Sequence, residues 1–287
     1  MKKTFKAFAK LTQLKLSLPV LVFTTLLGAA SVQTPPGIEL IAVLLANILV
    51  SWVFFIQRNL QFAPLDLTEP QKHAQNPIVS GDFKLNLARF LWVFFAVLAI
   101  ALYALTNTKT LISGLALLLI TILLNWRKAG LQRFFYLKPS FYHWLINGFF
   151  CLLGSLSLNS EIKPISLLTI AFVVFILLYI TIIDELRQPE THYSVRFLGI
   201  AAVISLTLAC CTAAVLFFVI RILPYWIVGL FILLLLILLL PQILERLREK
   251  KKPIIVLNRL RTPLFHSAAI ALIIHFIIPF LYKLMQK

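Results

Sequence analysis

Residues 165–183 read ISLLTIAFVVFILLYITII, a run of 19 residues that contains no charged side chain and no proline. A helix of roughly 20 apolar residues crosses a bilayer core about 30 Å thick, so this stretch predicts a transmembrane helix. Helical structure is favoured because a single segment in lipid has to satisfy its own backbone hydrogen bonds. The run stops at Asp184 and Glu185, which indicates that the span ends there and a polar connection begins.

Similar runs recur on both sides of this stretch. The 287 residues are 61% hydrophobic and 13% charged, with a mean hydropathy of +0.96, which excludes a water-soluble globule. Cutting the sequence at charged, proline and glycine clusters predicts nine spans: 14–32, 38–57, 85–106, 108–125, 142–158, 165–183, 197–219, 224–244 and 263–282. We therefore expect an all-α integral membrane protein, a nine-helix bundle in which residues 1–287 form a single transmembrane domain.

The positive charges are distributed unevenly between the two faces of this layout. Of the 27 lysines and arginines, all but five lie on the face that holds the N-terminus. The exceptions are Lys109, Lys163, Arg221, Lys283 and Lys287. By the positive-inside rule the basic face is cytoplasmic, which places the N-terminus inside and the C-terminus on the opposite side. The net charge of +17 then matches anionic lipid headgroups, and nucleic acid is not an expected partner.

The acidic residues are also concentrated on the expected cytoplasmic face. Only Glu39 and Glu161 lie on the other one. The two connections of interest are residues 57–82, between the second and third spans, and residues 183–199, between the sixth and seventh. The second of these contains three carboxylates within seven residues: Asp184, Glu185 and Glu190. Long polar connections of this kind are where functional residues are expected.

Both connections resemble the UbiA superfamily of intramembrane prenyltransferases. The segment Asn76-Pro77-Ile78-Val79-Ser80-Gly81 is similar to the family pattern R-P-[IL]-x-x-G, with Asn in place of Arg, and Asp66 precedes it by ten residues. Residues 184–190 followed by 193–199 look like a shortened form of the second acidic motif. The basic stretch 124–133 is similar to the family's sequence after its fourth helix. In that family nine helices surround a cytoplasmic active site formed by these two connections.

The resemblance implies a function and a set of site residues. It implies transfer of an isoprenoid chain from a prenyl diphosphate to an apolar, lipid-soluble acceptor, with Mg²⁺ as cofactor and membrane lipids as surroundings. The implied location is a bacterial inner membrane. The metal ligands would be Asp66, Asp184 and Glu190. The residues that contact the diphosphate would be Arg58, Asn59, Lys128, Arg133 and Arg187. No catalytic residue is assigned, and none of the histidines is expected to bind metal.

The first acidic motif departs from the family pattern. If Asp66 occupies the last acidic position of this motif, the earlier positions fall on Arg58, Asn59 and Phe62. The family has one asparagine and two aspartates at these three positions. Two alternatives therefore stay open: a catalytically inactive protein of the UbiA fold that binds lipid or scaffolds a partner, and an unrelated transporter. The span centres carry almost no charge, which argues against ion translocation.

Overall fold

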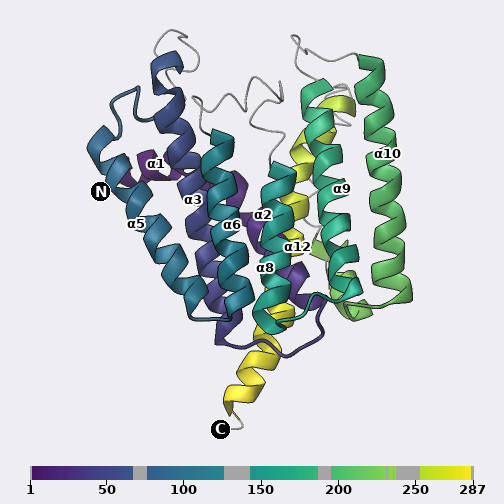
Figure 1. The fold of residues 1–287 in the computed structure, drawn as a ribbon. Coiled ribbons are helices and arrows are strands. Elements are labelled where there is room, and N and C mark those ends of the chain that lie inside the picture. The colour runs from purple at the N-terminus through teal and green to yellow at the C-terminus, as the bar shows by residue number, and fades with distance from the viewer. Residues whose placement is uncertain are drawn as a thin grey trace.

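The computed structural model describes residues 2–66, 76–125, 143–186, 195–230, 232–234, 236 and 253–285. All regular structure in these ranges is helical, which confirms the expected all-α class, and Figure 1 shows the helices side by side in one bundle. The elements are α1 (Lys2–Leu11), α2 (Leu14–Ala30), α3 (Ile38–Asp66), α5 (Leu85–Ala104), α6 (Thr108–Asn125), α8 (His143–Leu158), α9 (Pro164–Leu186), α10 (Val195–Ala214), the π-helix η3 (Val215–Val219) and α12 (Pro253–Met285).

Five of these helices are long and apolar enough to cross a membrane. They cover Ile38–Pro64, Leu85–Ala104, Thr108–Asn125, Pro164–Ile183 and Phe197–Val219. Four shorter apolar helices cover Ser17–Ala30, His143–Leu158, Tyr225–Leu234 and Pro263–Pro279. The number of nine spans and the orientation of the termini stay predictions.

Two helices extend further than the sequence pattern indicated. We expected the second span to end near residue 57, whereas α3 continues as a helix to Asp66. The last helix begins at Pro253, ten residues before the expected start of the ninth span at residue 263. In both cases polar and charged side chains interrupt the additional residues, so hydropathy marks where the uninterrupted apolar run ends and not where the helix ends. The extension of α3 carries Arg58 and Asn59 on a regular helix.

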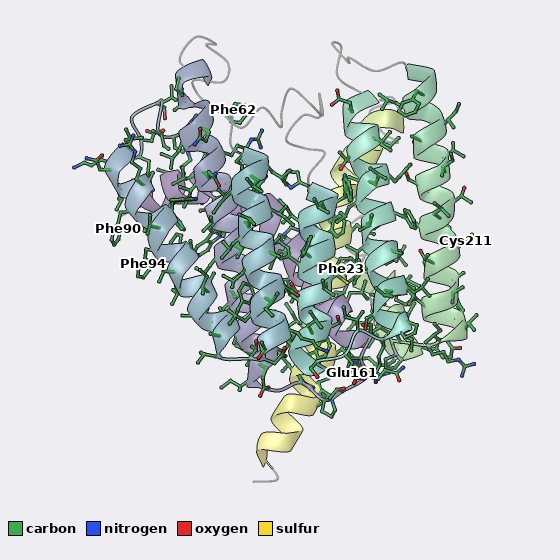
Figure 2. All side chains as sticks on the ribbon, viewed as in Figure 1. Phe23, Phe62, Phe90, Phe94, Glu161 and Cys211 are labelled. Atoms are coloured by element: carbon green, nitrogen blue, oxygen red, sulfur yellow. The ribbon has the colours of Figure 1, made fainter. Side chains whose placement is uncertain are left out.

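The outer surface of the bundle is apolar. On α5 the side chains of Phe90, Phe94 and Val97 are 61%, 47% and 61% exposed, and Figure 2 shows the two phenylalanines pointing away from the bundle. On α10 the side chains of Val203 and Ile204 are likewise exposed. Exposed apolar surface on this scale is stable only in contact with lipid or another protein. The exposed faces of α5 and α10 are therefore the expected lipid-facing surfaces.

Helices α2 and α8 make a close contact through their backbones. A methyl group on Gly28 would overlap the carbonyl group of Cys151, and one on Gly154 would overlap the carbonyl group of Thr25. The two glycines thus let the backbones of α2 and α8 touch, as small residues commonly do between membrane helices. This crossing fixes the distance between the two helices that line the candidate site.

Buried polar side chains connect the same helices to α3 and α5. The Tyr103 hydroxyl donates to Asn47 Oδ1 at 2.6 Å, and Asn47 Nδ2 donates to Thr25 Oγ1 at 2.9 Å. Thr24 donates to Asn147 Oδ1 at 3.4 Å. The side chains of Tyr103, Asn47, Thr25 and Thr24 are fully buried, so these hydrogen bonds satisfy groups that would otherwise be costly in an apolar interior. They fix the relative positions of four helices.

The N-terminal segment forms a short helix that packs against the bundle. The ring of Phe8 lies 5.2 Å from the ring of Trp52 on α3 and 6.3 Å from that of Phe95 on α5, while Ala7 and Leu11 are buried. A break follows at Gln13, whose φ is +47°, and the chain then turns into α2. No helix was predicted before the first span at residue 14, so α1 is an addition to the expected architecture.

Candidate functional site

The described residues of the two polar connections lie at one end of the bundle. Figure 1 shows the C-terminal ends of α3 and α9 and the N-terminal end of α10 at the top, whereas Glu161, labelled in Figure 2, is at the bottom. We call the top the polar end, defined by Asp66, residues 76–84 and residues 184–186. The helix directions alone therefore bring together two segments that are about 120 residues apart in the sequence.

A cavity of about 210 Å³ lies between α2, α3, α8 and α9 on the side of the bundle that faces the polar end. Six of its thirteen lining residues are polar: Gln13, Ser17, Ser51, His143, Asn147 and Thr181. We call this space the polar cavity. None of the lining residues that the structure describes carries a fixed charge, and the rest of the described wall includes Phe54, Phe55 and Phe150. Such a mixture of aromatic surface and a few polar groups is typical of small-molecule sites.

His143 is placed in this wall by contacts with two helices. Its ring centroid lies 5.9 Å from the ring centroids of both Phe54 and Phe55 on α3. Its backbone carbonyl accepts a hydrogen bond of 2.7 Å from Asn147 Nδ2, and the other end of that amide accepts one from Thr24 on α2. The first turn of α8 is thus connected to α2 and α3 at the cavity.

Asn59 and Asn76 join three segments at the polar end. Asn59 Nδ2 donates to the carbonyl oxygens of Leu11, at 3.1 Å, and Phe55, at 2.8 Å. Asn76 is buried, and its Nδ2 donates to the carbonyl oxygen of Asn59 at 3.0 Å. The two amides therefore hold the end of α1, the polar turn of α3 and the start of the following loop together. In this conformation both N–H groups of the Asn59 amide are directed at backbone carbonyls.

The loop at residues 76–84 is a compact turn. Asn76 Oδ1 accepts from the backbone N–H of Ile78 at 3.1 Å, and the carbonyl oxygen of Pro77 accepts from the N–H of Phe83 at 2.8 Å. Gly81 has a φ of +77°, a backbone conformation that glycine adopts without strain. The motif-like spacing of Asn76, Pro77 and Gly81 is thus explained locally by the requirements of this turn.

The structure describes only some of the predicted site residues. The side chains of Arg58 and Asn59 are both partly buried on the last turns of α3, and they stay predicted diphosphate contacts. Asp66 and Asp184 are placed as helical backbone, without a description of their side chains. Lys128, Arg133, Arg187 and Glu190 lie outside the described residues. Within the described part of the chain, no three metal-binding side chains form a group.

Glu185 lies next to Asp184 on the last turn of α9, and its side chain is only 1% exposed. Buried carboxylates are rare, and in a membrane-embedded helix an ionisable residue points to a functional role. The sequence pattern marked Asp184 and Glu185 together as acidic residues. The predicted metal ligands, however, are Asp184 and Glu190 and do not include Glu185. The structure adds Glu185 as the acidic side chain of α9 that is directed into the bundle.

Sequence reasoning missed three side chains of the polar cavity. His143 was interpreted as a rim residue, and Ser51 and Asn147 were not selected at all. One signal was present: His143 and Asn147 are four residues apart at the start of an apolar helix, so they share one helix face. Ser51 had no such signal because a single serine in an apolar helix also satisfies itself by bonding to its own backbone.

A second cavity lies further from the polar end. It has a volume of about 290 Å³ and is enclosed by α2, α9, η3, α12 and the start of the helix Tyr225–Leu234. All fourteen lining residues are apolar, and Phe23, Phe172, Phe217, Phe218 and Phe265 supply five aromatic rings. We call it the apolar pocket. Its residues follow those of the polar cavity along α2 and precede them along α9, which places it deeper in the bundle.

Comparison with solved structures identifies the architecture. A UbiA homologue from Aeropyrum pernix K1, in its apo form, matches with a TM-score of 0.62 and 18% identity, covering 88% of this chain and 96% of that chain. This chain has the UbiA fold. A digeranylgeranylglyceryl phosphate synthase in membranes matches with a TM-score of 0.59 and 16% identity, over 94% of this chain and 99% of that one.

A third UbiA-fold structure, a homologue from Archaeoglobus fulgidus bound to DMAPP and Mg²⁺, has a TM-score of 0.57 and 14% identity, over 93% of this chain and 98% of that chain. No family model and no curated protein matches the sequence. The fold implied by the two polar connections is thereby confirmed. Together with the five long apolar helices, the UbiA fold shows that this is an integral membrane protein.

Proposed function

We propose that the protein is a membrane prenyltransferase, which moves an isoprenoid chain from a prenyl diphosphate to a lipid-soluble acceptor. The observation that carries this proposal is the polar cavity beside the acidic helix ends of a UbiA fold. The apolar pocket further along α2 and α9 supports it, because an isoprenoid tail needs an apolar environment of that kind. The proposed location is a bacterial inner membrane with the polar end in the cytoplasm.

Mg²⁺ is the proposed cofactor, and the residue types at the polar end suit it. Asp66 ends α3, while Asp184 and Glu185 end α9, so carboxylates come from two helices at the same end of the bundle. Hard divalent cations prefer such oxygen ligands and commonly bridge them to phosphate. We propose Asp66, Asp184 and Glu190 as the ligands. When bound, the ion would stabilise negative charge that develops on the departing diphosphate.

Basic residues would supply the remaining charge compensation. We propose that Arg58, Lys128, Arg133 and Arg187 contact the diphosphate, with Asn59 beside them. A guanidinium group suits this task because its planar fork donates two parallel hydrogen bonds to phosphate oxygens. The position of Arg58 on the helical extension of α3, one turn beyond the cavity residues Phe54 and Phe55, supports this assignment.

One observation favours a different function with the same fold. The Asn59 side chain stands where the family has an acidic residue, and its amide hydrogens are directed to the carbonyl oxygens of Leu11 and Phe55. An amide used in this way contributes to the packing of α1 and offers little to a metal ion. The alternative is therefore a catalytically inactive protein that binds a prenyl lipid or scaffolds a partner.

The proposal is tested with purified protein in lipid nanodiscs and labelled prenyl diphosphates of several chain lengths. We expect Mg²⁺-dependent binding and transfer of label to a lipid product. Asp184→Ala should weaken donor binding by at least about tenfold, as expected for loss of a charged contact. The matched control is Asp82→Ala, because Asp82 is an exposed aspartate at the same end that bonds to Ser80.

The outcomes separate the proposal from its rival. Absence of donor binding at every chain length would contradict the proposed function. Binding without product in the wild type, with product only after Asn59→Asp is combined with Phe62→Asp, would favour the inactive protein. Product formation by the wild type would exclude that alternative.

A further inference from the structure

The polar cavity contains a single described lining residue that can take up a proton near neutral pH. Its other polar side chains are the amides of Gln13 and Asn147 and the hydroxyls of Ser17, Ser51 and Thr181. Amides and aliphatic hydroxyls do not titrate in this range, whereas an imidazole does. His143 is therefore distinguished from the rest of the described cavity wall by its chemistry.

The position of His143 is determined by its neighbours. The rings of Phe54 and Phe55 lie at equal centroid distances from the imidazole, 5.9 Å in each case, with interplanar angles of 69° and 33°. The backbone of His143 is tied to Asn147, and Asn147 is tied to α2 through Thr24. A side chain placed in this way is pre-organised, which is a requirement for a group that acts on a substrate.

Ser51 indicates independently that the cavity receives a polar ligand. It lines the cavity from α3, and its side chain is 6% exposed. Its hydroxyl has no hydrogen-bond partner among the residues that the structure describes. Serines in membrane helices commonly bond to the backbone of the preceding turn, whereas Ser51 makes no such bond and lines the cavity. A polar atom of a bound molecule would provide the missing hydrogen bond.

Prenyl transfer produces a proton that has to be removed. The allylic carbon–oxygen bond breaks, and its electron pair leaves with the diphosphate. A new bond then joins the allylic carbon to the nucleophilic atom of the acceptor, which must lose its own proton. A base positioned beside that atom typically contributes 10²–10⁴-fold to such a step. The step therefore calls for a proton acceptor inside the cavity.

The geometry points to His143 as the side chain that removes the acceptor's proton during prenyl transfer, with Ser51 orienting the acceptor by a hydrogen bond. This inference rests on the proposed function. Proton transfer converts the imidazole into an imidazolium cation. The neighbouring rings of Phe54 and Phe55 can stabilise this cation through their π-systems. The imidazolium then gives its proton to the departing diphosphate or to water, which restores the neutral ring.

The test compares wild type with His143→Gln in nanodiscs, using labelled geranyl diphosphate as donor and a membrane lipid extract as the source of acceptor. We expect transfer at saturating donor to fall by at least about 10²-fold in His143→Gln, as for the loss of a general base. Donor binding should change by less than about threefold, because the diphosphate is held elsewhere. The matched control is His275→Gln, since His275 contacts Trp226 and Phe276 outside the polar cavity.

A second variant separates a chemical role from a structural one. In His143→Ala the cavity gains the volume of the ring. Added imidazole should therefore raise the transfer rate of this variant by at least about tenfold. A side chain needed only for packing would give no such recovery in rate.

Each outcome decides the inference. Equal transfer by wild type and His143→Gln, or a loss in His143→Gln that is explained by lost donor binding, would overturn the role of His143 and leave the proposed function intact. A wild-type protein that binds donor but forms no product would overturn both. Imidazole rescue together with unchanged binding would support the role of His143.

Discussion

The two cavities of the bundle are built from neighbouring parts of the same helices but have opposite chemistry. On α2, Gln13 and Ser17 line the polar cavity, and Phe23 and Leu27 line the apolar pocket. On α9, Thr181 lies in the first and Phe172 in the second. Among the described residues that line the two cavities, the polar side chains of α2 and α9 lie only in the part of each helix that faces the polar end. The fold thus separates a polar from an apolar cavity by depth along α2 and α9, as the proposed transfer of an isoprenoid chain would require.

The largest effect is expected where α2 and α8 cross, because this contact maintains the walls of the polar cavity. In Gly154→Ala the new methyl group would overlap the carbonyl group of Thr25, so the two helices have to move apart. Overpacking of this kind costs about 3 kcal/mol. We expect the melting temperature in detergent to fall by about 6–12 °C, at roughly 2–4 °C per kcal/mol for a domain of this size.

The control for this substitution is Gly229→Ala, since a methyl group there meets no atom within 4 Å. Its melting temperature should match that of the wild type. Equal melting temperatures for the Gly154 and Gly229 variants would show that the crossing is looser than the structure indicates, and that the cavity wall is not held by it.

The pattern of apolar runs predicted the membrane architecture because lipid imposes a simple requirement on the chain. A span has to be helical, apolar and about 20 residues long, and each of these properties can be read from local sequence. The same pattern placed the end of the second span near residue 57, although α3 continues to Asp66. The α3 extension is held by contacts such as those of Asn59 with Leu11 and of Asn76 with Asn59, which hydropathy does not contain.

The charged residues of the candidate site could be predicted from the sequence, whereas its uncharged residues could not. Asp184 and Glu185 interrupt an apolar run, so the sequence selected them directly. His143, Ser51 and Asn147 become one site only because α3 and α8 pack side by side at the polar cavity. The position of α8 also depends on Gly154, which lets α8 approach α2 closely, and this role is visible in the three-dimensional contact and not in the sequence spacing.

A second test compares the two cavities by filling part of the apolar pocket. Ala268 is buried in the wall of the apolar pocket, so Ala268→Trp should occupy part of its volume. If the pocket holds the isoprenoid tail, affinity for geranylgeranyl diphosphate should fall by at least about tenfold, which corresponds to about two methylene groups that are no longer buried. Affinity for dimethylallyl diphosphate should stay unchanged, because its short chain does not extend beyond the polar cavity.

The matched control is Ala101→Trp on the exposed face of α5, which should leave both affinities at the wild-type level. An equal loss for the short and the long donor in Ala268→Trp would contradict the division of labour between the cavities. The melting temperatures of both variants are measured together with their donor affinities. A loss of binding that is caused by loss of folded protein is then recognised.

The smallest effect is expected for a polar group that lies outside both cavities. The Tyr103 hydroxyl donates to Asn47, which in turn donates to Thr25, and none of the three lines either cavity. Tyr103→Phe removes one hydrogen bond between membrane helices, a loss of about 1 kcal/mol. We expect a fall in melting temperature of about 2–4 °C and no change in donor affinity.

Tyr179→Phe is the control for this last substitution, because the partly buried Tyr179 hydroxyl has no hydrogen-bond partner in the described part of the chain. Its removal should leave the melting temperature at the wild-type value. If Tyr103→Phe instead weakens donor binding without lowering the melting temperature, the Tyr103–Asn47–Thr25 hydrogen bonds act on the site. The polar groups that affect donor binding would then extend deeper into the bundle than the walls of the polar cavity.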